Sequence, residues 1–208
     1  MEPVVLQDMA AVEHLFSIIR DRETEYPEFS MRISVLGSMV IAEALKHAPF
    51  KNLTVQTPLE PVAVKRILEK DIVGIPILRA GLGMVKPFQR LLPNASVYHI
   101  GLKRDEETLA PDYYYDSLPR DLTGRTIFLL DPMLATGGSA VAAAELVAKR
   151  NPTAMVFCGI IGAPEGVKML SERFPKMPIY LGALDDHLDE NGYIRPGLGD
   201  AGDRLFGT

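Results

Sequence analysis

The sequence predicts an α/β domain in which a mainly parallel sheet is flanked by helices, and three observations carry this prediction. First, short apolar runs alternate with helical patterns from residue 72 onward. Second, residues 126–130 form an unbroken apolar run, which is typical of a strand buried on both faces. Third, the helical stretch at residues 139–150 lies between that run and the next one. A strand, a helix and a strand in this order favour parallel pairing.

Two helices are expected within residues 1–50, because apolar residues recur there at helical spacing. The 208 residues fit a single domain, with a core at about residues 51–184 and a tail at residues 185–208. Pro49 closes the second helix. The two apolar stripes consist of Val12, Leu15, Phe16 and Ile19, and of Ile33, Leu36, Val40 and Ala44.

Further strands are expected at residues 72–78, 97–102 and 154–161. Because Pro76 has no N–H to donate to a neighbouring strand, we expect a strand end or a bulge there. Two segments break the regular order: residues 103–120, which are polar and then aromatic, and the glycine-rich tail. Long irregular segments in a compact domain are usually functional.

Composition argues against several classes of protein. The 22 Lys and Arg and 27 Asp and Glu give a net charge of −5, which predicts no nucleic-acid partner. Every apolar run is shorter than the roughly 20 residues of a membrane span, and residues 1–10 lack the cationic start of a secretory signal. We therefore expect a cytoplasmic protein with no membrane partner. The four His and the single Cys158 lack the spacing of metal ligands.

The strongest local motif is residues 129–139, LLDPMLATGGS, where a predicted strand ends in an acid and a glycine-containing loop leads into a helix. The N–H groups and dipole at a helix start favour phosphate, and glycines allow close backbone approach. Asp131 can accept hydrogen bonds from the vicinal hydroxyls of a sugar. The motif favours a phosphate site at the carboxyl edge of the sheet. The structural alternative is a helix capped by Ser139.

Arg79 follows the strand at residues 72–78 and precedes the glycines of RAGLG. A cation at this edge could bind pyrophosphate oxygens, or it could pair with a structural carboxylate. The charge pattern of residues 103–109, KRDEETL, is by itself that of a solvated loop, and the three tyrosines at residues 113–115 could form a hairpin. Asp185 and Asp186 favour a strand-end turn or a supporting contact over a metal site.

The tail contains a formal G-x-G-x-x-G at Gly197, Gly199 and Gly202, but only six residues follow it, too few for a dinucleotide fold. A glycine-rich surface loop is one alternative. The other is backbone recognition of a small planar ring such as uracil, whose edge presents two carbonyls and an N–H. Cytosine would leave buried polar groups unpaired in such a site.

These motifs together resemble the uracil-specific branch of the type I phosphoribosyltransferases. Residues 129–139 resemble the motif that binds phosphoribosyl pyrophosphate (PRPP), with Pro132 where a second acid is common. PILRAGLGM at residues 76–84 resembles the pyrophosphate loop, and the tail from Gly192 resembles the base-binding terminus. The resemblance spans about residue 54 to the C-terminus. It is weaker at the N-terminus, where Ser30 stands in place of a usual Arg. A second departure is Lys103, at a position where Tyr is common in the family.

The resemblance implies a type I phosphoribosyltransferase fold with a β-arm at residues 103–120 used in dimerisation and a C-terminal base-binding hood. It implies transfer of the phosphoribosyl group from PRPP to uracil, giving UMP in pyrimidine salvage, in a homodimer or higher oligomer that GTP could regulate. Mg²⁺ would enter with PRPP, held through the oxygens of PRPP and water, with few direct protein ligands. The implied catalytic residues are Arg104, Asp131 and Asp200; the PRPP site adds Arg79, Pro132, Met133, Leu134, Ala135, Thr136, Gly137, Gly138 and Ser139; uracil would meet Ile194, Gly199, Asp200 and Ala201.

Two other functions stay open at this point. A protein of the same fold could be an RNA-binding regulator, which would require a basic face and salt-dependent RNA affinity. A purine-specific transferase is the second alternative. The net charge opposes the first, and the Asp131-Pro132 pair and the tail oppose the second.

Overall fold

The computed structural model describes residues 2–104 and 111–208, and a nine-stranded sheet organises them. The pairs along the sheet are parallel except for the last, between β6 and β7. Two short strands, β5 (Ser96–Val97) and β9 (Met133–Leu134), pair with β4 and β10. The sheet order is β1 (Val4–Val5), β11 (Ile179–Leu184), β10 (Ala154–Gly162), β8 (Thr126–Leu130), β4 (Ile72–Leu78), β6 (Ile100–Arg104) and β7 (Pro111–Asp116).

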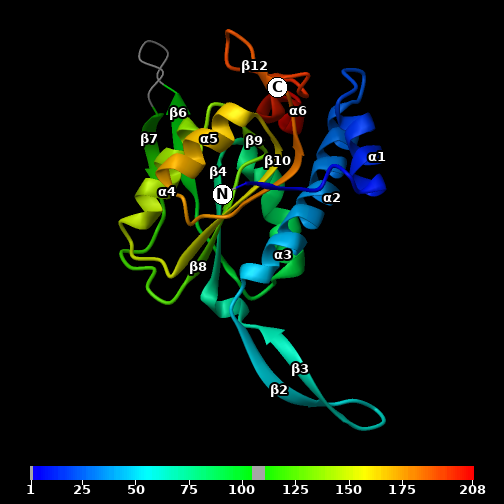
Figure 1. Cartoon of the computed structure of the whole chain (residues 1–208), viewed down its shortest axis with the longest axis vertical. Coiled ribbons are helices and arrows are strands. Elements are labelled where there is room, and N and C mark those ends of the chain that lie inside the picture. Colours follow the sequence, from blue (N-terminus) through cyan, green and yellow to red (C-terminus); the bar gives the residue numbers. More distant parts are fainter. Residues whose placement is uncertain (1, 105–110) are drawn as a thin grey trace.

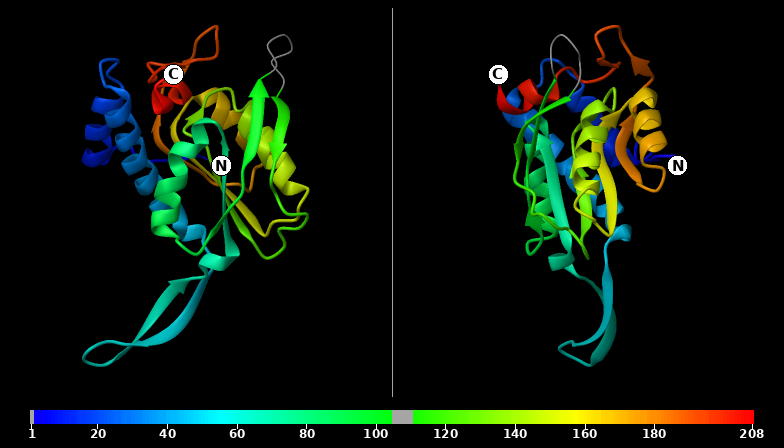
Figure 2. Two further views of the ribbon diagram at one scale, coloured as in Figure 1. Left: turned by 180° about the vertical axis from the view of Figure 1, so that it is seen from behind. Right: turned by 90° about the vertical axis from the view of Figure 1, so that its left-hand side faces the viewer.

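Helices cover both faces of this sheet (Figure 2). The side chains of β8 alternate between the two faces, as a strand with helices on both sides requires. Phe128 and Leu130 pack into one core with α1 (Ala10–Ile19) and α2 (Tyr26–Ala44). Ile127 and Leu129 pack into a second core with α4 (Gly138–Ala148) and α5 (Pro164–Arg173). The predicted fold class is therefore confirmed.

The predicted strands are present with small changes. The strand expected at residues 97–102 is two strands, β5 and β6, separated at Tyr98 and His99. The expected end or bulge at Pro76 is wrong, because the register of β4 with β8 is unbroken from Ile72 to Pro76 and β4 continues to Leu78. The opposite edge of β4 pairs with β5 at Gly74 and with β6 at Ile77, so Pro76 lies where that neighbour changes.

The element that projects from the body is a hairpin of β2 (Phe50–Gln56) and β3 (Pro61–Ile67) (Figure 1). This corrects the prediction of the arm at residues 103–120. The strand β6, which leads into that segment, pairs with β4 at Ile100 and Gly101, and β7 pairs with β6, so both belong to the main sheet. The strands β2 and β3 pair only with each other. The Tyr113 hydroxyl donates to the Ala142 carbonyl at 2.7 Å and holds β7 against α4. Residues 105–110 lie outside the described part.

The remaining elements connect and close the body. The 3₁₀ turns η1 (Leu45–His47) and η2 (Glu69–Asp71) flank the projecting hairpin, while η3 (Ala80–Met84) leads into α3 (Val85–Leu91). The tail forms β12 (His187–Leu188), β13 (Ile194–Arg195) and α6 (Ala201–Phe206), a helix too short to be predicted from periodicity. Among residues 2–104 and 111–208, the helices lack the length and apolar character needed to span a bilayer.

Candidate active site

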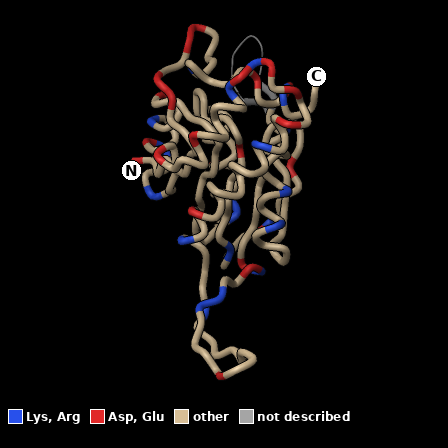
Figure 3. The backbone as a smooth tube through the Cα atoms, turned by 90° about the vertical axis from the view of Figure 1, so that its right-hand side faces the viewer, with Lys and Arg blue, Asp and Glu red and all other residues tan. Residues whose placement is uncertain are grey.

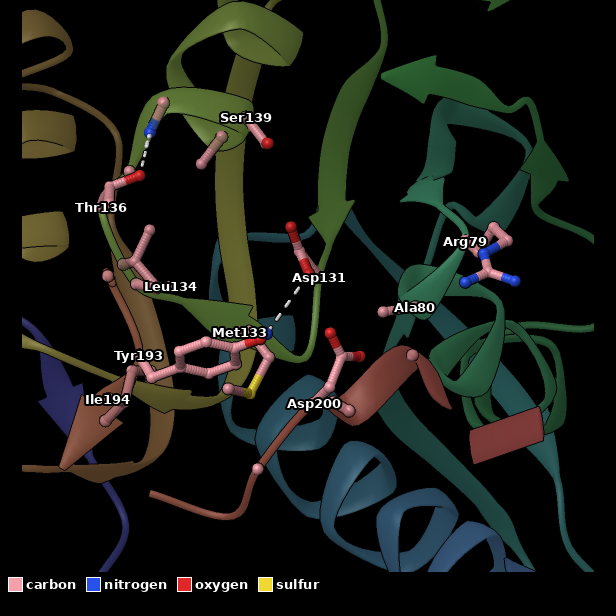
Figure 4. A pocket seen from close by; sticks show the side chains of 18 residues that line it. Arg79, Ala80, Asp131, Met133, Leu134, Thr136, Ser139, Tyr193, Ile194 and Asp200 are labelled. Carbon is pink, nitrogen blue, oxygen red and sulfur yellow. Dashed lines mark hydrogen bonds between the residues drawn. The ribbon is translucent and has the colours of Figure 1, made fainter. Parts of the chain in front are cut away.

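A cavity of ≈ 360 Å³ opens at the carboxyl ends of β4 and β8 (Figure 4). Three segments line it: residues 79–80 after β4, residues 131–140 after β8 except Pro132, and parts of the tail. The predicted sites for phosphate, pyrophosphate and a planar base therefore share one cavity, and Thr136 and Asp200 both line it. This is the arrangement expected at the edge of an α/β sheet.

The phosphate loop, residues 133–139, begins in β9 and ends in the first turn of α4. Gly137 has φ +85° and is the N-cap, so the alternative of a cap by Ser139, which lies inside the helix, is wrong. Gly138 N–H donates to Thr136 Oγ1 at 3.4 Å. The first N–H groups of a helix have no partner within it, and those of α4 begin at the cavity wall. With the helix dipole, this geometry suits an anion.

Asp131 follows β8 and lies at the centre of the cavity lining (Figure 4). Only 9% of its surface is exposed. Burial raises the pKa of its carboxyl to about 7, and the hydrogen bond from Met133 N–H at 3.2 Å opposes this rise. Ligand hydroxyls that donate to the carboxylate would favour its charged form. Asp131 is thus suited to hold a sugar diol.

Arg79 follows β4, after a cis peptide bond between Leu78 and Arg79. A Cβ added to the nearby Gly81 would lie 2.5 Å from the Leu130 carbonyl oxygen, so only glycine allows this close packing beside β8. This close packing brings the ends of β4 and β8 together, so that Arg79 and Asp131 line the same cavity. Arg79 Nη2 is 3.5 Å from Asp203 Oδ1, and both side chains are more than half exposed. This contact is too weak for a structural ion pair, so the guanidinium remains available to an anion.

The tail folds onto the body, so the alternative of a glycine-rich surface loop is wrong. Ile194, Leu198 and Ala201 are buried, whereas Gly199 and Asp200 line the cavity. Positive φ angles at Gly197 (+69°) and Gly199 (+78°) produce the turn. Asp200 is the N-cap of α6 and accepts a hydrogen bond from Asp203 N–H at 3.0 Å.

Two predicted residues lie elsewhere or cannot be placed. Pro132 is not among the described cavity-lining residues; its carbonyl accepts hydrogen bonds from Ile160 and Ile161 N–H at 3.0 and 2.9 Å, which ties the loop to β10. Arg104 ends β6, but its side chain lies outside the described part. The remaining predicted residues line the cavity: Arg79, Asp131, Met133, Leu134, Ala135, Thr136, Gly137, Gly138, Ser139, Ile194, Gly199, Asp200 and Ala201.

The sequence interpretation missed Tyr193, whose ring borders the cavity beside Ile194 and Met133 (Figure 4). An aromatic residue after Gly192 within a glycine-rich segment was the available signal. Asp189 fixes this turn, because its Oδ1 accepts from Tyr193 N–H at 2.9 Å and from Asn191 N–H at 3.0 Å. The other missed lining residues are Ala80, Ala140, Gly192 and Gly202.

The model of the family described as uracil phosphoribosyltransferase matches residues 5–208. The chain belongs to the uracil phosphoribosyltransferase family. It is 46% identical over 208 residues to the uracil phosphoribosyltransferase of Agathobacter rectalis, with both chains fully covered. It is 48% identical over 199 residues to that of Lactococcus lactis subsp. cremoris, covering 95% of this chain and 94% of the relative.

Two solved structures share the fold of this chain. A protein from Aquifex aeolicus superposes with a TM-score of 0.90 at 37% identity, covering 98% of this chain and 97% of that one. A hypoxanthine-guanine phosphoribosyltransferase from Bacillus anthracis matches with a TM-score of 0.51 at 11% identity, covering 76% of this chain and 80% of that one. The second match shows the fold alone. The uracil phosphoribosyltransferase assignment therefore rests on the family model and on the sequence relatives.

The carboxylates at this cavity fit a cation that a ligand also binds. Asp131 and Asp200 line the cavity. Nowhere in the described ranges do three or more His, Cys, Asp or Glu side chains come together to hold a metal ion. Mg²⁺ commonly keeps several waters and takes only one or two carboxylates plus phosphate oxygens. The residues present therefore fit Mg²⁺ bound to a diphosphate.

Proposed function

We propose that the chain transfers the phosphoribosyl group of PRPP to uracil, forming UMP and pyrophosphate in pyrimidine salvage. One observation carries the assignment of this reaction to the cavity: the phosphate loop before α4 and the buried tail turn line the same space. A phosphate site alone would fit many nucleotide enzymes. The tail turn adds backbone groups to the same cavity, where they can bind a base attached to the sugar, and the family membership gives that base as uracil.

The residue roles follow from position. Residues Ala135 to Ser139 cradle the 5′-phosphate with backbone N–H groups and hydroxyls, and Asp131 accepts hydrogen bonds from the ribose diol. Ile194, Gly199 and Ala201 present backbone groups to the uracil edge. Asp200 lies between the base and the ribose, where it can orient water around the Mg²⁺ of the incoming Mg–PRPP.

In the reaction, uracil N1 forms a bond to ribose C1 while the bond from C1 to pyrophosphate breaks, and the N1 proton is released. Arg79 and Arg104 neutralise the charge that develops on pyrophosphate. Holding the two substrates in reacting geometry can lower the barrier by roughly 7–11 kcal/mol. Positioning and charge stabilisation supply the mechanism, and it assigns no general base.

The projecting hairpin supports a homodimer or higher oligomer. Leu59 at its tip is 93% exposed, and Phe50 and Val62 are also exposed. Figure 3 shows that charges interrupt the hairpin mainly near its base, and residues 53–64 contain only Glu60 as a charged residue. An apolar ladder this far from the body gains stability by packing on a second copy. Regulation by GTP and a cytoplasmic location stay predictions from the sequence.

The test is direct. The purified chain is incubated with PRPP, Mg²⁺ and each nucleobase separately, and the monophosphate formed is identified by chromatography. UMP from uracil, with cytosine and purines inactive, is the expected result. Turnover of a purine in preference to uracil would refute the base assignment. Assays with and without GTP, and with increasing salt and RNA, check the effector and the absence of a nucleic-acid partner.

A further inference from the structure

The tail turn that carries the uracil-facing backbone is held from outside by the junction between α1 and α2. Two glycines with positive φ, Gly197 and Gly199, form this turn. Glycines lose more conformational freedom on ordering than other residues, so a turn built on them needs external contacts to stay in one position. Two arginines at opposite ends of the sequence supply these contacts.

Arg204, in α6, donates four hydrogen bonds to backbone carbonyls. Nη1 reaches the carbonyl of Ile19 at 2.6 Å and that of Leu198 at 2.8 Å. Nη2 reaches the carbonyls of Asp21 at 2.7 Å and Thr24 at 3.4 Å. One guanidinium thus joins the residue before Gly199 to the loop that connects α1 and α2.

These carbonyls are a suitable target for a cation. The last carbonyls of a helix lack partners within it and carry partial negative charge. The last turn of α1, residues 16–19, contains only Phe, Ser and Ile, so its own sequence supplies no cation there. The Arg204 guanidinium also lies 4.1 Å from the centroid of the buried Phe29 ring. The Phe29 ring, which belongs to α2, therefore also holds the guanidinium group in place.

Arg20 holds the other side of the turn. Its guanidinium pairs with both carboxylate oxygens of Asp185, at 2.7 and 2.6 Å, and donates to the Gly197 carbonyl at 2.8 Å. Asp185 Oδ2 also accepts from Gly197 N–H at 2.8 Å. Both peptide groups of Gly197 are thus fixed to the end of β11 and to the residue after α1.

We propose that Arg204, with the Arg20–Asp185 pair, is a positioning residue for uracil: it fixes the backbone that reads the base, without touching the base itself. This inference rests on the proposed function. The phosphate loop is held separately, by β9 pairing with β10 and by the start of α5 against Ala135. Asp200 is the tail residue with a proposed role toward PRPP, so loosening the junction weakens uracil recognition strongly and PRPP recognition only slightly.

The decisive variant is Arg204→Lys, which keeps the charge but loses the fork that reaches several carbonyls at once. Because a displacement of about 1 Å can reduce the rate about 10²-fold, we expect the KM for uracil to rise roughly 10- to 100-fold. The KM for PRPP should stay within about threefold of wild type, since residues 133–139 keep their own supports. Initial rates measured against each substrate, at saturation of the other, give the two values.

The matched control is Arg150→Lys. Arg150 is also partly buried, pairs with Asp116 at 2.9 Å and lies outside the cavity lining. This variant should lose stability without changing the KM for uracil, which separates positioning from general destabilisation. If Arg204→Lys does not fold, Phe29→Leu tests the same relationship, because it removes the ring under the guanidinium; we expect a smaller rise confined to uracil.

An equal rise in both KM values, or none in either, from a folded Arg204→Lys or Phe29→Leu protein would overturn the positioning role. A wild-type protein that forms no UMP would instead overturn the proposed function, so the two failures are distinct. A rise in the KM for uracil in the Arg150→Lys control equal to that in Arg204→Lys would also overturn the proposal.

Discussion

Gly166, near the start of α5, lies directly against the carbonyl oxygen of Ala135 in the phosphate loop. A Cβ added at Gly166 would be 2.3 Å from that oxygen and 2.7 Å from the Leu134 carbonyl oxygen. These are backbone atoms, so the contact can be relieved only by moving the loop or the helix. The packing of α5 therefore sets the position of the residues that are proposed to hold phosphate.

Gly166→Ala should displace the phosphate loop. Overpacking of this kind destabilises proteins by about 1–3 kcal/mol. We expect this loss in chemical denaturation, together with a rise of roughly 10²-fold in the KM for PRPP. Gly124→Ala is the control: its φ of +80° makes the substitution strained, but the added Cβ meets nothing within 4 Å among the described residues. An unchanged KM for PRPP in a folded Gly166→Ala protein would contradict the argument.

Asp131 should make stability depend on pH in the absence of ligand. Burial raises the pKa of its carboxyl from 3.8 to about 7, so the folded chain binds this proton more tightly than the unfolded chain. The stability that the protonated Asp131 carboxyl contributes is fully present below its pKa in the unfolded chain. It is lost as pH rises through its pKa in the folded chain. The free energy of unfolding of wild type should fall between about pH 4 and pH 7 relative to Asp131→Asn. Parallel curves for the two proteins would contradict the assignment.

Asp131→Asn should also weaken PRPP binding much more than uracil binding. The amide carries an N–H₂ group where the carboxylate oxygen accepts from a ribose hydroxyl, and hydrogen bonds to charged groups contribute about 1.5–3 kcal/mol. We expect a rise of roughly 10- to 100-fold in the KM for PRPP. Equal losses for both substrates would argue against a contact with the diol.

Arg104→Ala should lower kcat while the fold survives. Loss of one group that stabilises developing charge reduces rates by roughly 10²–10³-fold. Steady-state kinetics and a melting curve measured on the same preparation check both halves of the statement. Near-normal turnover would remove Arg104 from the mechanism.

Leu59→Asp should weaken self-association without affecting the fold of the body. The side chain lies at the hairpin tip and is 93% exposed, so a charge there has no cost within one copy. Sedimentation at several concentrations should show a lower mass for the variant than for wild type. Glu60→Gln, at the neighbouring position, is the control. An unchanged mass would place the contact between copies elsewhere.

The sequence predicted the parts of the site whose signal is local. An apolar strand, Asp131 and the glycine loop follow one another directly, so β8 and the phosphate loop could be predicted together. For the tail, the glycines left a surface loop and a base-binding turn both open, and the family resemblance favoured the second. These elements could be predicted without knowing which other elements pack against them.

The parts that were missed depend on contacts distant in sequence. The strands β2 and β3 are largely exposed; residues 53–56 of β2 alternate between apolar and polar, but β3 lacks the alternation that marks a half-buried strand. The contacts of Arg204 are made to carbonyls, which every residue possesses, so no residue type reveals them. The prediction at Pro76 was wrong because one edge of β4 passes from pairing with β5 to pairing with β6 around this residue. The amino-acid sequence does not reveal which strands will pair with β4.

The alternation along β8 places the tail and α4 in different cores. Leu198, Ala201 and Leu205 of the tail belong to the core that contains α1 and α2, whereas Ala140, Ala143 and Ala144 of α4 belong to the core on the opposite face. Substitutions that share no partners have nearly additive effects. The tail can therefore be changed with little effect on the α4 core, provided that its packing against Met133 and Ala135 of the phosphate loop is kept.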